Sequence, residues 1–267
     1  MPRYDEIRDF VLSLDTPDEG SRSYLEIHQE RIAITLNLVP PPFHTKSVLE
    51  LGAYMQMTPA LHCILGYPNV RGAYYGPLGK SDRKQSTVNG KVVFECWVDC
   101  FNADKDTFPY EDGTFDCVLA CEIFEHLLHD PMHMLLECRR ILVEGGSLVL
   151  TTPNVASATA VKRTLEMSGN PQLYSKYADP RGEYAATEFG HMREYTPAEL
   201  TELLAAAGFK ISWLFTTHAP GYHSRDEVVA ILEQLGYPTA LRGEQMYCVA
   251  EKRAGLPVTR YPAFLYE

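Results

Sequence analysis

The amino-acid sequence predicts an α/β fold of the doubly wound class, in which helices cover both faces of a mainly parallel sheet. Seven short apolar runs follow one another along the chain, and several of them are continuously apolar. Such runs are typical of strands that are buried on both faces of a parallel sheet. Helix-like patterns separate most of the runs, and this alternation favours right-handed crossover connections.

The boundaries of the predicted elements follow from these patterns. The predicted strands span residues 47–52, 70–76, 92–99, 115–121, 147–152, 209–217 and 245–252. The predicted helices between them span residues 58–66, 130–142 and 196–209. The last helix has the clearest signals, because Thr196 can cap it, Glu199 completes a capping box and Gly208 ends it. Pro197 suits its first turn.

Two segments lie outside the alternation of strands and helices. Residues 1–45 carry two amphipathic helix patterns, around 4–14 and 21–38, so we expect a helical segment before an α/β domain of residues 46–267. Residues 153–195 form an insertion rich in Tyr, Gly, Asn and Pro at the carboxyl side of the sheet, which is typical of a lid or a substrate wall. The tyrosines that are candidates for such a wall are Tyr174, Tyr177, Tyr184 and Tyr195.

Composition and charge exclude several classes of protein. Of the 267 residues, 45% are hydrophobic and 22% are charged, which is ordinary for a globular chain. The net charge of −11 disfavours a nucleic-acid polymer as partner, because phosphate backbones repel an acidic surface. No apolar run approaches the ~20 residues of a membrane span, and the N-terminus lacks a signal-peptide core. The seven cysteines include no CxxC pair, so we expect a reduced, cytoplasmic protein, whose oligomeric state the sequence leaves open.

The loop after the first predicted strand is the first candidate for a ligand site, since ligands of open α/β sheets bind beyond the carboxyl ends of the strands. This loop reads "LELGAYMQMTP" and has no glycine at positions 54 or 56. A nicotinamide dinucleotide requires a GxGxxG turn for its pyrophosphate. The second predicted strand ends in "AYYG", without an acidic residue for a ribose. A dehydrogenase is therefore disfavoured.

Residues 47–153 instead resemble the class I S-adenosylmethionine-dependent methyltransferases. The resemblance rests on "SVLELGAY", on the stretch from "FNADKDTFPY" through "EIFEHLLHDP" to "TTPN", and on "GHMREYTPAELTELLAAAGF" further along the chain. It implies a Rossmann-like sheet of seven strands in the order 3-2-1-4-5-7-6, with the last strand antiparallel. It also implies S-adenosylmethionine as the methyl donor.

The resemblance assigns donor contacts by position. The residues it implies are Glu50, Gly52, Ala53, Tyr54, Tyr75, Asn102, Ala103, Asp104 and Cys121. The donor would lie over Gly52 and Ala53, and Glu50 would orient that turn. Residues 102–104 would flank the adenine, and the backbone of Cys121 would lie beside the methionine part.

The first loop and the second strand depart from most of this superfamily. "GAYMQ" stands in place of a GxGxG turn, and Tyr75 stands where an acidic residue usually closes the second strand. A glycine-poor loop beginning "ELGA" resembles one branch of these enzymes that is often linked to glycan and natural-product pathways. The resemblance therefore implies a small polyhydroxylated or glycan acceptor.

The stretch "EIFEH" after the fourth predicted strand is the strongest chemical signal. If it is helical, Glu122, Glu125 and His126 converge on one face, and carboxylates with imidazole suit Mg²⁺, Mn²⁺, Fe²⁺ or Zn²⁺. The stretch resembles the ExxEH motif of small-RNA 2′-O-methyltransferases and some ubiquinone-pathway O-methyltransferases. In the RNA enzymes a later histidine is the fourth ligand, and "GHMREYT" supplies His191 in that register.

The same residues allow a reading without metal, in which a glutamate caps a helix and His126 contacts the substrate or acts as a base. In the metal-assisted reading, Glu122 and His126 are the catalytic candidates of an O-methyltransferase that transfers a methyl group in one displacement. Two other hypotheses remain open. One is a non-catalytic binding protein with a decayed donor loop, and the other is a metal-dependent lyase or hydrolase on the same sheet.

Overall fold

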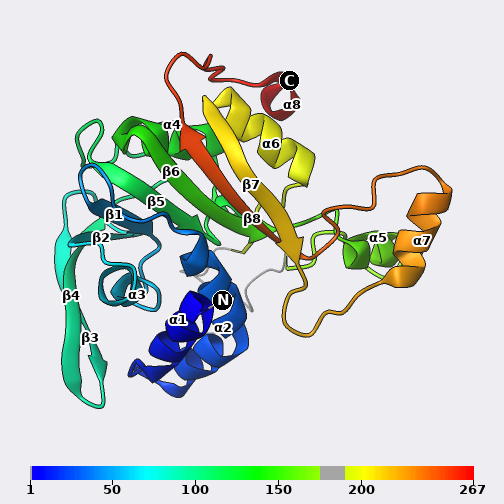
Figure 1. Cartoon of the computed structure of the whole chain (residues 1–267). Coiled ribbons are helices and arrows are strands. Elements are labelled where there is room, and N and C mark those ends of the chain that lie inside the picture. Colours follow the sequence, from blue (N-terminus) through cyan, green and yellow to red (C-terminus); the bar gives the residue numbers. More distant parts are fainter. Residues whose placement is uncertain (1, 175–189) are drawn as a thin grey trace.

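The computed structural model describes residues 2–174 and 190–267 and contains a single mixed sheet of eight strands in its described part (Figure 1). The strands are β1 (Ser47–Leu51), β2 (Asn69–Tyr74), β3 (Ser81–Val88), β4 (Lys91–Cys100), β5 (Phe115–Cys121), β6 (Leu142–Pro153), β7 (Phe209–Thr217) and β8 (Gln245–Lys252). Their order in the sheet is β3-β4-β2-β1-β5-β6-β8-β7. All seven predicted strands form.

The sheet topology agrees with the expected order for these seven strands. Strands β4, β2, β1, β5 and β6 are parallel neighbours, and β8 runs antiparallel to both β6 and β7. The expected count of seven is wrong, because β3 pairs antiparallel with the outer edge of β4. Strand β3 reads "SDRKQSTV" and has a single buried residue, so it lacks the apolar character from which the other strands were predicted.

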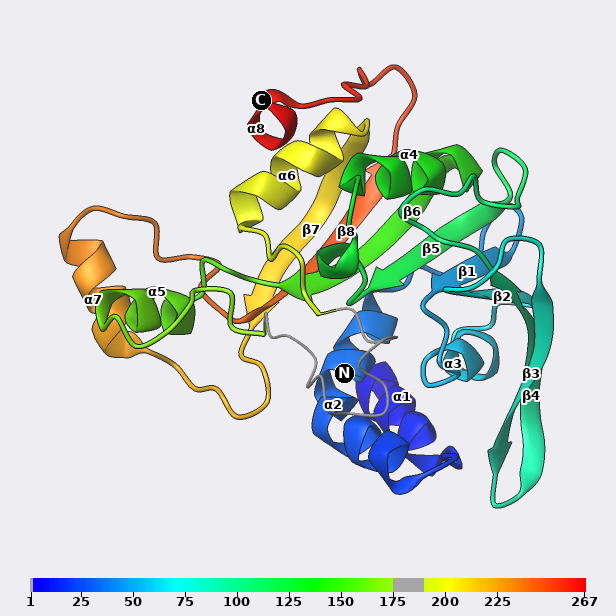
Figure 2. The same cartoon turned by 180° about the vertical axis from the view of Figure 1, so that it is seen from behind.

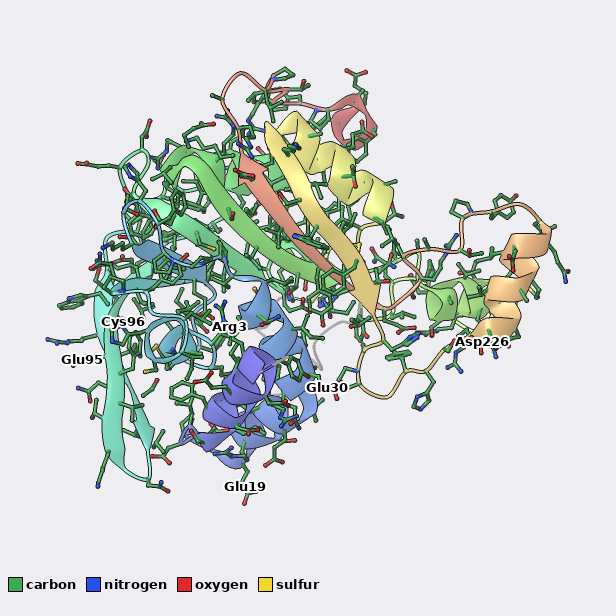
Figure 3. All side chains as sticks on the ribbon, in the orientation of Figure 1. Arg3, Glu19, Glu30, Glu95, Cys96 and Asp226 are labelled. Atoms are coloured by element: carbon green, nitrogen blue, oxygen red, sulfur yellow. The ribbon has the colours of Figure 1, made fainter. Side chains whose placement is uncertain are left out.

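A tight turn at Asn89 and Gly90 makes the β3–β4 hairpin. Both residues have positive φ, 51° and 73°, as a two-residue hairpin turn requires. The carboxylate of Asp15 accepts hydrogen bonds from both of their backbone N–H groups, at 3.1 and 2.8 Å. The hairpin tip is thereby fastened to the loop between the N-terminal helices. Glu95 and Cys96 mark its longer strand in Figure 3.

Helices cover both faces of the sheet. Among the described residues they are α1 (Pro2–Ser13), α2 (Glu19–Leu38), α3 (Thr58–Cys63), η1 (Phe124–His126, a 3₁₀ turn), α4 (Pro131–Ile141), α5 (Ala158–Leu165), α6 (Pro197–Ala206), α7 (Asp226–Gln234) and α8 (Ala263–Tyr266). One apolar core joins α1, α2 and α3 to one face, and a second joins α4 and α6 to the other. The doubly wound arrangement is therefore confirmed (Figures 1 and 2).

The predicted helix signals agree with the observed ends. Helix α6 begins with a complete capping box between Thr196 and Glu199, and Gly208 follows it at φ +79°. Asp18 caps α2 by accepting a hydrogen bond from the backbone N–H of Ser21. The two predicted N-terminal helices are thus α1 and α2. No helix in the described ranges is long and apolar enough to cross a membrane.

The predicted insertion is only partly described. Its first part contains α5, which packs against α7 through a small apolar cluster that includes Ala158, Val228 and Leu232. These two helices project from the carboxyl-terminal edge of the sheet (Figure 1), and Asp226 marks the start of α7 in Figure 3. Residues 175–189, with the predicted wall residues Tyr177 and Tyr184, lie outside the described residues.

Asp116, in β5, binds the segment that leads into β1. Its buried carboxylate accepts hydrogen bonds from the backbone N–H groups of residues 43–46 at 2.7–3.0 Å and from the Thr45 hydroxyl at 2.9 Å. Burial alone would raise the pKa of this carboxyl, but the hydrogen bonds outweigh it and hold the pKa below its ordinary value.

We predict that Asp116→Asn lowers the free energy of unfolding at pH 7 by about 3 kcal/mol, because an amide NH₂ would face backbone donors. Since the pKa is lower in the folded protein, this stabilisation is present above about pH 4 and is lost as the pH falls through the folded value. Urea unfolding at pH 7 and pH 3 should show that the difference in free energy of unfolding between wild type and Asp116→Asn is smaller at pH 3. Asp5→Asn, at an exposed surface pair, is the control. Equal stability of wild type and Asp116→Asn at pH 7 would refute the prediction.

Candidate active site

A cavity of about 620 Å³ lies beyond the carboxyl-terminal edge of the sheet, where ligands of doubly wound folds bind. Its walls come from α2, the loop after β1, the segment after β5, the end of β6, and the segments that precede α6 and follow β7. Two groups of charged side chains line it. One surrounds Glu125, and the other surrounds Glu122.

Glu125 carries a buried carboxylate oxygen that has no hydrogen-bond partner within the described chain. The residue is fully buried, and its Oε2 accepts a hydrogen bond from the Thr152 hydroxyl at 2.9 Å. Its Oε1 is buried and unpaired. Burial, together with the negative charge of Glu122, raises the pKa of the Glu125 carboxyl well above its usual range. Such a group requires either a proton or a cation beside it.

Two imidazoles approach this unpaired oxygen. The Nε2 atoms of His126 and His191 lie 4.0 and 3.9 Å from Glu125 Oε1. The two rings are perpendicular, with centroids 4.7 Å apart. The potential ligand atoms of Glu125, His126 and His191 all lie within 4.8 Å of one another, close enough to share one cation. The structure thus brings together three of the four residues that were predicted as metal ligands.

Backbone hydrogen bonds join the two distant segments of this cluster. The carbonyl of Glu125 accepts from the N–H groups of Met192 and Arg193, at 2.8 and 3.3 Å. Phe124 is fully buried and packs against Tyr195, with ring centroids 4.7 Å apart. The 3₁₀ turn and the segment before α6 are therefore fixed to each other on both sides of the cluster.

Glu194 orients His191. Its buried carboxylate lies 3.0 Å from His191 Nδ1, and it accepts hydrogen bonds from the backbone N–H groups of Leu173 and Tyr174 at 3.2 and 3.0 Å. A proton on Nδ1 directed at this carboxylate leaves the lone pair of Nε2 towards Glu125. Metal-binding histidines have this kind of carboxylate partner.

Glu122 does not join the cluster, which corrects the expected four-residue set and the expected helix. Its φ is +54°, so the chain turns sharply at the end of β5, and η1 begins only at Phe124. Thr151 donates to Glu122 and Thr152 donates to Glu125. Because successive strand residues point to opposite faces, the two carboxylates are held on opposite sides of β6.

Glu122 is held on the side that α2 covers. Its Oε1 accepts hydrogen bonds from the Thr151 hydroxyl and the Gln245 side chain, both at 2.7 Å, and lies 3.4 Å from Arg31 Nη1. Arg31 belongs to α2, and it also donates to the Tyr24 hydroxyl at 2.5 Å. An ion pair between helix and sheet therefore lines the cavity.

The predicted donor loop follows β1. Glu50 is buried, and its carboxylate accepts a hydrogen bond from the Thr58 hydroxyl at 2.6 Å, across the loop. Burial raises the pKa of Glu50 to about 8. Gly52 has φ +70°, and a Cβ there would meet the side chain of Ile123 at 3.0 Å. Ala53 donates its N–H to the carbonyl of Ala73 in β2. Glycine is thus required where this loop leaves the strand.

The other predicted donor residues near this loop are spread around it. Tyr54 lines the cavity, and its hydroxyl accepts a hydrogen bond from Tyr74 at the end of β2. Tyr75 is 61% exposed. Burial, with the nearby charges of Glu50 and Glu122, raises the pKa of the Cys121 thiol well above its usual range. Of the predicted donor residues in the described chain, Tyr54 is the one that lines this cavity.

Residues 102–104, the predicted adenine contacts, build a support for the neighbouring loop. The buried Asp104 carboxylate accepts hydrogen bonds from the backbone N–H groups of Leu128, His129 and Asp130 at 2.9–3.2 Å. Asn102 accepts from the N–H of Asp104, and Ala103 packs against the core. The Asp104 side chain therefore holds the loop between η1 and α4.

Sequence reasoning missed several side chains of this site. Gln245 and Thr152, each of which holds a carboxylate, gave no signal, because β6 and β8 are distant from "EIFEH" in the chain. Tyr174, by contrast, was among the predicted wall residues; it lines the cavity, and its buried hydroxyl has no hydrogen-bond partner within the described chain. The hairpin of β3 could have been found, since the dipeptide Asn89-Gly90 is the strongest short hairpin signal.

Comparison with known proteins agrees with this fold. A family model described as a methyltransferase domain matches residues 24–212, well over half of the chain. The chain belongs to the methyltransferase domain family. The match begins in α2 and ends in β7, so it includes the cavity's helix, the first loop and the cluster around Glu125.

Two curated proteins match shorter parts of this chain. A probable S-adenosylmethionine-dependent methyltransferase of Mycolicibacterium smegmatis is 30% identical over 114 residues, 43% of this chain and 36% of that protein. An uncharacterized 37.1 kDa protein in transposon TN4556 of Streptomyces fradiae is 40% identical over 65 residues, 24% of this chain. The chain spans about a third and about a fifth of the length of these relatives.

Solved structures share the fold. One is a chain in the complex of the Trm112 methyltransferase activator of Haloferax volcanii with a protein described as a methyltransferase (TM-score 0.54, 16% identity, 93% of this chain and 98% of that one). Another is a SAM dependent methyltransferase of Archaeoglobus fulgidus (TM-score 0.51, 16% identity, 88% of this chain and 100% of that one). In the first, a protein activator is a partner.

Proposed function

We propose that this protein is an S-adenosylmethionine-dependent O-methyltransferase that uses a divalent cation and acts on a small, neutral, polyhydroxylated or glycan-type acceptor. The observation that carries the proposal is the unpaired, buried Oε1 of Glu125 beside the Nε2 atoms of His126 and His191. Donor binding rests on membership of the family and on a cavity whose volume suits a ligand of that size.

The chemistry of the cluster fits a cation. A fully buried carboxylate with one unpaired oxygen is unfavourable unless a positive charge compensates it. One carboxylate and two imidazoles favour a first-row metal such as Mn²⁺, Fe²⁺ or Zn²⁺ over Mg²⁺, which prefers oxygen ligands. Glu125, His126 and His191 would hold it, and Glu194 would orient His191. When bound, such a cation supplies a Lewis acid that lowers the pKa of a neighbouring hydroxyl group.

The side chains contribute positioning and exclusion of water. The cavity walls from α2, the first loop and the segment after β5 would hold the donor and acceptor in line, which lowers the barrier to a single displacement. As a ligand, His126 would have its Nε2 lone pair committed to the cation. Without the cation, His126 is the side chain of the cluster nearest to solvent and would be the candidate for accepting the acceptor's proton. The ring is 35% exposed, while that of His191 is 15% exposed.

Polarity of the cavity favours a neutral acceptor. Arg31 is the one lysine or arginine among its described lining residues, and it is paired with Glu122. Burial lowers the pKa of His28 to about 4, with Arg31 as a second cause, so this imidazole is neutral at pH 7. Tyr174 and His28 both line the cavity, and each has a buried polar atom that finds no hydrogen-bond partner in the described part of the chain. Hydroxyl groups of an acceptor would satisfy both.

The insertion of residues 153–195 is proposed as the acceptor wall of a methyltransferase domain that spans residues 46–267. Support comes from Pro153, Tyr174 and His191, which all line the cavity. The segment of residues 1–45 would complete the opposite wall, since α2 contributes Tyr24, His28 and Arg31.

The test is an acceptor screen with S-adenosylmethionine and Mn²⁺, followed by isothermal titration of Mn²⁺ into wild type and His191→Ala. The screen uses neutral glycosides and catechol, with amine and thiol compounds of similar size as the contrast. We expect methyl ethers as products, loss of turnover in a chelator, and recovery with added metal. His191→Ala should lose at least 100-fold in Mn²⁺ affinity while S-adenosylhomocysteine affinity stays within threefold.

His129→Ala is the matched histidine control, since that ring hydrogen-bonds Asp104 outside the cluster. Full activity of His191→Ala in chelator would overturn the metal assignment. Methylation of the amines alone would overturn O-methylation. Absence of binding of either S-adenosylmethionine or S-adenosylhomocysteine would favour a non-catalytic binding protein, and metal-dependent turnover without a methyl donor would favour a lyase or hydrolase.

A further inference from the structure

The ion pair between Arg31 and Glu122 is not explained by the metal cluster. It joins α2 to the end of β5, and its two side chains are 10% and 23% exposed. Both residues line the cavity, next to Tyr54 of the first loop. Burying two charges carries a desolvation penalty. An ion pair that only joined the helix to the sheet would also have no need to face a cavity.

The contacts of Glu122 are asymmetric. The Thr151 hydroxyl, the Gln245 amide and Arg31 all approach its Oε1. Within the described chain, Oε2 receives no hydrogen bond, so it is available to a ligand in the cavity. The carboxylate of Glu122 is therefore held through Oε1, and Oε2 remains for a ligand in the cavity.

The backbone of Glu122 supports the same conclusion. A non-glycine residue at φ +54° is uncommon, and such strain persists where the surrounding structure holds it and is concentrated at ligand sites. The N–H of Glu122 continues the sheet by donating to the Thr151 carbonyl at 2.9 Å. The turn therefore aims this side chain back across the strand end, towards α2, and away from Glu125.

Arg31 offers the complementary charge. One of its guanidinium nitrogens faces Glu122, and another donates to the Tyr24 hydroxyl at 2.5 Å. A guanidinium has five N–H donors, so N–H groups remain for a ligand carboxylate. Tyr24 and Arg31 are two helical turns apart and lie on the face of α2 that lines the cavity.

We propose that Arg31 and Glu122 form a receptor for the α-amino-acid end of the methyl donor, in which Arg31 binds the carboxylate and Glu122 Oε2 accepts from the ammonium group. An α-amino acid carries opposite charges on adjacent groups, and this pair presents opposite charges 3.4 Å apart. The inference rests on the donor named under the proposed function. It gives Glu122 a donor-binding role in place of the metal-ligand role expected from the sequence.

The test compares two ligands that differ only at this end. S-adenosylhomocysteine and 5′-methylthioadenosine share the adenosyl thioether, but the second lacks the amino-acid group. Isothermal titration is done with wild type, Arg31→Gln, Arg31→Lys and Glu122→Gln, with Glu30→Gln as an exposed carboxylate control on the same helix (Figure 3). Thermal unfolding of each free variant is measured in parallel.

We expect Arg31→Gln and Glu122→Gln each to weaken S-adenosylhomocysteine binding about 10- to 100-fold, the effect of one charge-assisted hydrogen bond. Affinity for 5′-methylthioadenosine should change less than threefold. The affinity of Arg31→Lys for S-adenosylhomocysteine should lie between those of wild type and Arg31→Gln. If Arg31→Gln does not fold, the inference is tested with Arg31→Lys and Glu122→Gln. Glu30→Gln should behave as wild type with both ligands.

If the variants bind both ligands equally more weakly than wild type does, the ion pair only supports the fold. That result would overturn this inference and leave the proposed function standing. Unchanged binding of both ligands by Arg31→Gln and Glu122→Gln would do the same. Wild type that binds neither ligand would instead overturn the methyl donor of the proposed function, and the inference with it. The two failures are therefore distinguishable.

Discussion

Glu125→Gln is expected to abolish binding of a divalent cation and, with it, methyl transfer. The substitution keeps the volume of the side chain and an acceptor for the Thr152 hydroxyl, but it removes the only carboxylate of the three-residue cluster in the described chain. Two neutral imidazoles alone bind Mn²⁺ weakly. We expect the Mn²⁺ affinity to fall by at least 1,000-fold and turnover to fall to the level of the chelated wild type.

The same substitution should leave the metal-free protein as stable as wild type, or up to about 2 kcal/mol more stable, because a buried carboxylate with an unpaired oxygen is itself unfavourable. Urea unfolding in chelator measures this, and isothermal titration measures Mn²⁺ and S-adenosylhomocysteine binding. Glu202→Gln, on the exposed side of α6, controls for loss of one negative charge. Mn²⁺ affinity of Glu125→Gln within tenfold of wild type would exclude the cluster as the metal site.

Glu194→Gln should lower Mn²⁺ affinity by about 10- to 100-fold, which is the usual effect of removing the hydrogen-bonded carboxylate behind a metal-binding histidine. In the structure this carboxylate lies 3.0 Å from His191 Nδ1 and also accepts from the backbone N–H groups of Leu173 and Tyr174. Losing a charged acceptor for these groups should also cost about 1–3 kcal/mol of folding stability.

Glu194 is a positioning residue, so its effect should pass through His191. A double-mutant cycle with His191→Ala and Glu194→Gln distinguishes this from a general loss of structure. If Glu194 acts by orienting the imidazole, the double variant binds Mn²⁺ no more weakly than His191→Ala alone. Additive losses would show that Glu194 acts independently of His191, and the positioning role would then be rejected.

The fold was predictable because its signals are local. Seven continuous or alternating apolar runs marked the strands, and Thr196, Glu199 and Gly208 marked the ends of α6 as the structure has them. Strand β3 was not predictable from apolar character, because an edge strand faces solvent and reads as polar. Only the Asn89-Gly90 turn signals it.

The site was predictable in part. The sequence places Glu125 and His126 directly after a buried strand, and the likeness of "GHMREYT" to a known motif brought in His191. The expectation failed at Glu122, because it assumed a helix from 122 to 126. The chain instead turns at Glu122 with positive φ, and only a single 3₁₀ turn follows.

By itself, then, the sequence determined the fold class, the order of the main elements and the position of a carboxylate–histidine stretch at the ligand-binding edge. The tertiary structure alone decided which of those side chains meet. Neighbouring residues of β6 point to opposite faces of the sheet, so Thr151 holds Glu122 towards Arg31 of α2, while Thr152 holds Glu125 towards His191. Contacts between elements far apart in the chain, rather than spacing along "EIFEH", separate the two carboxylates.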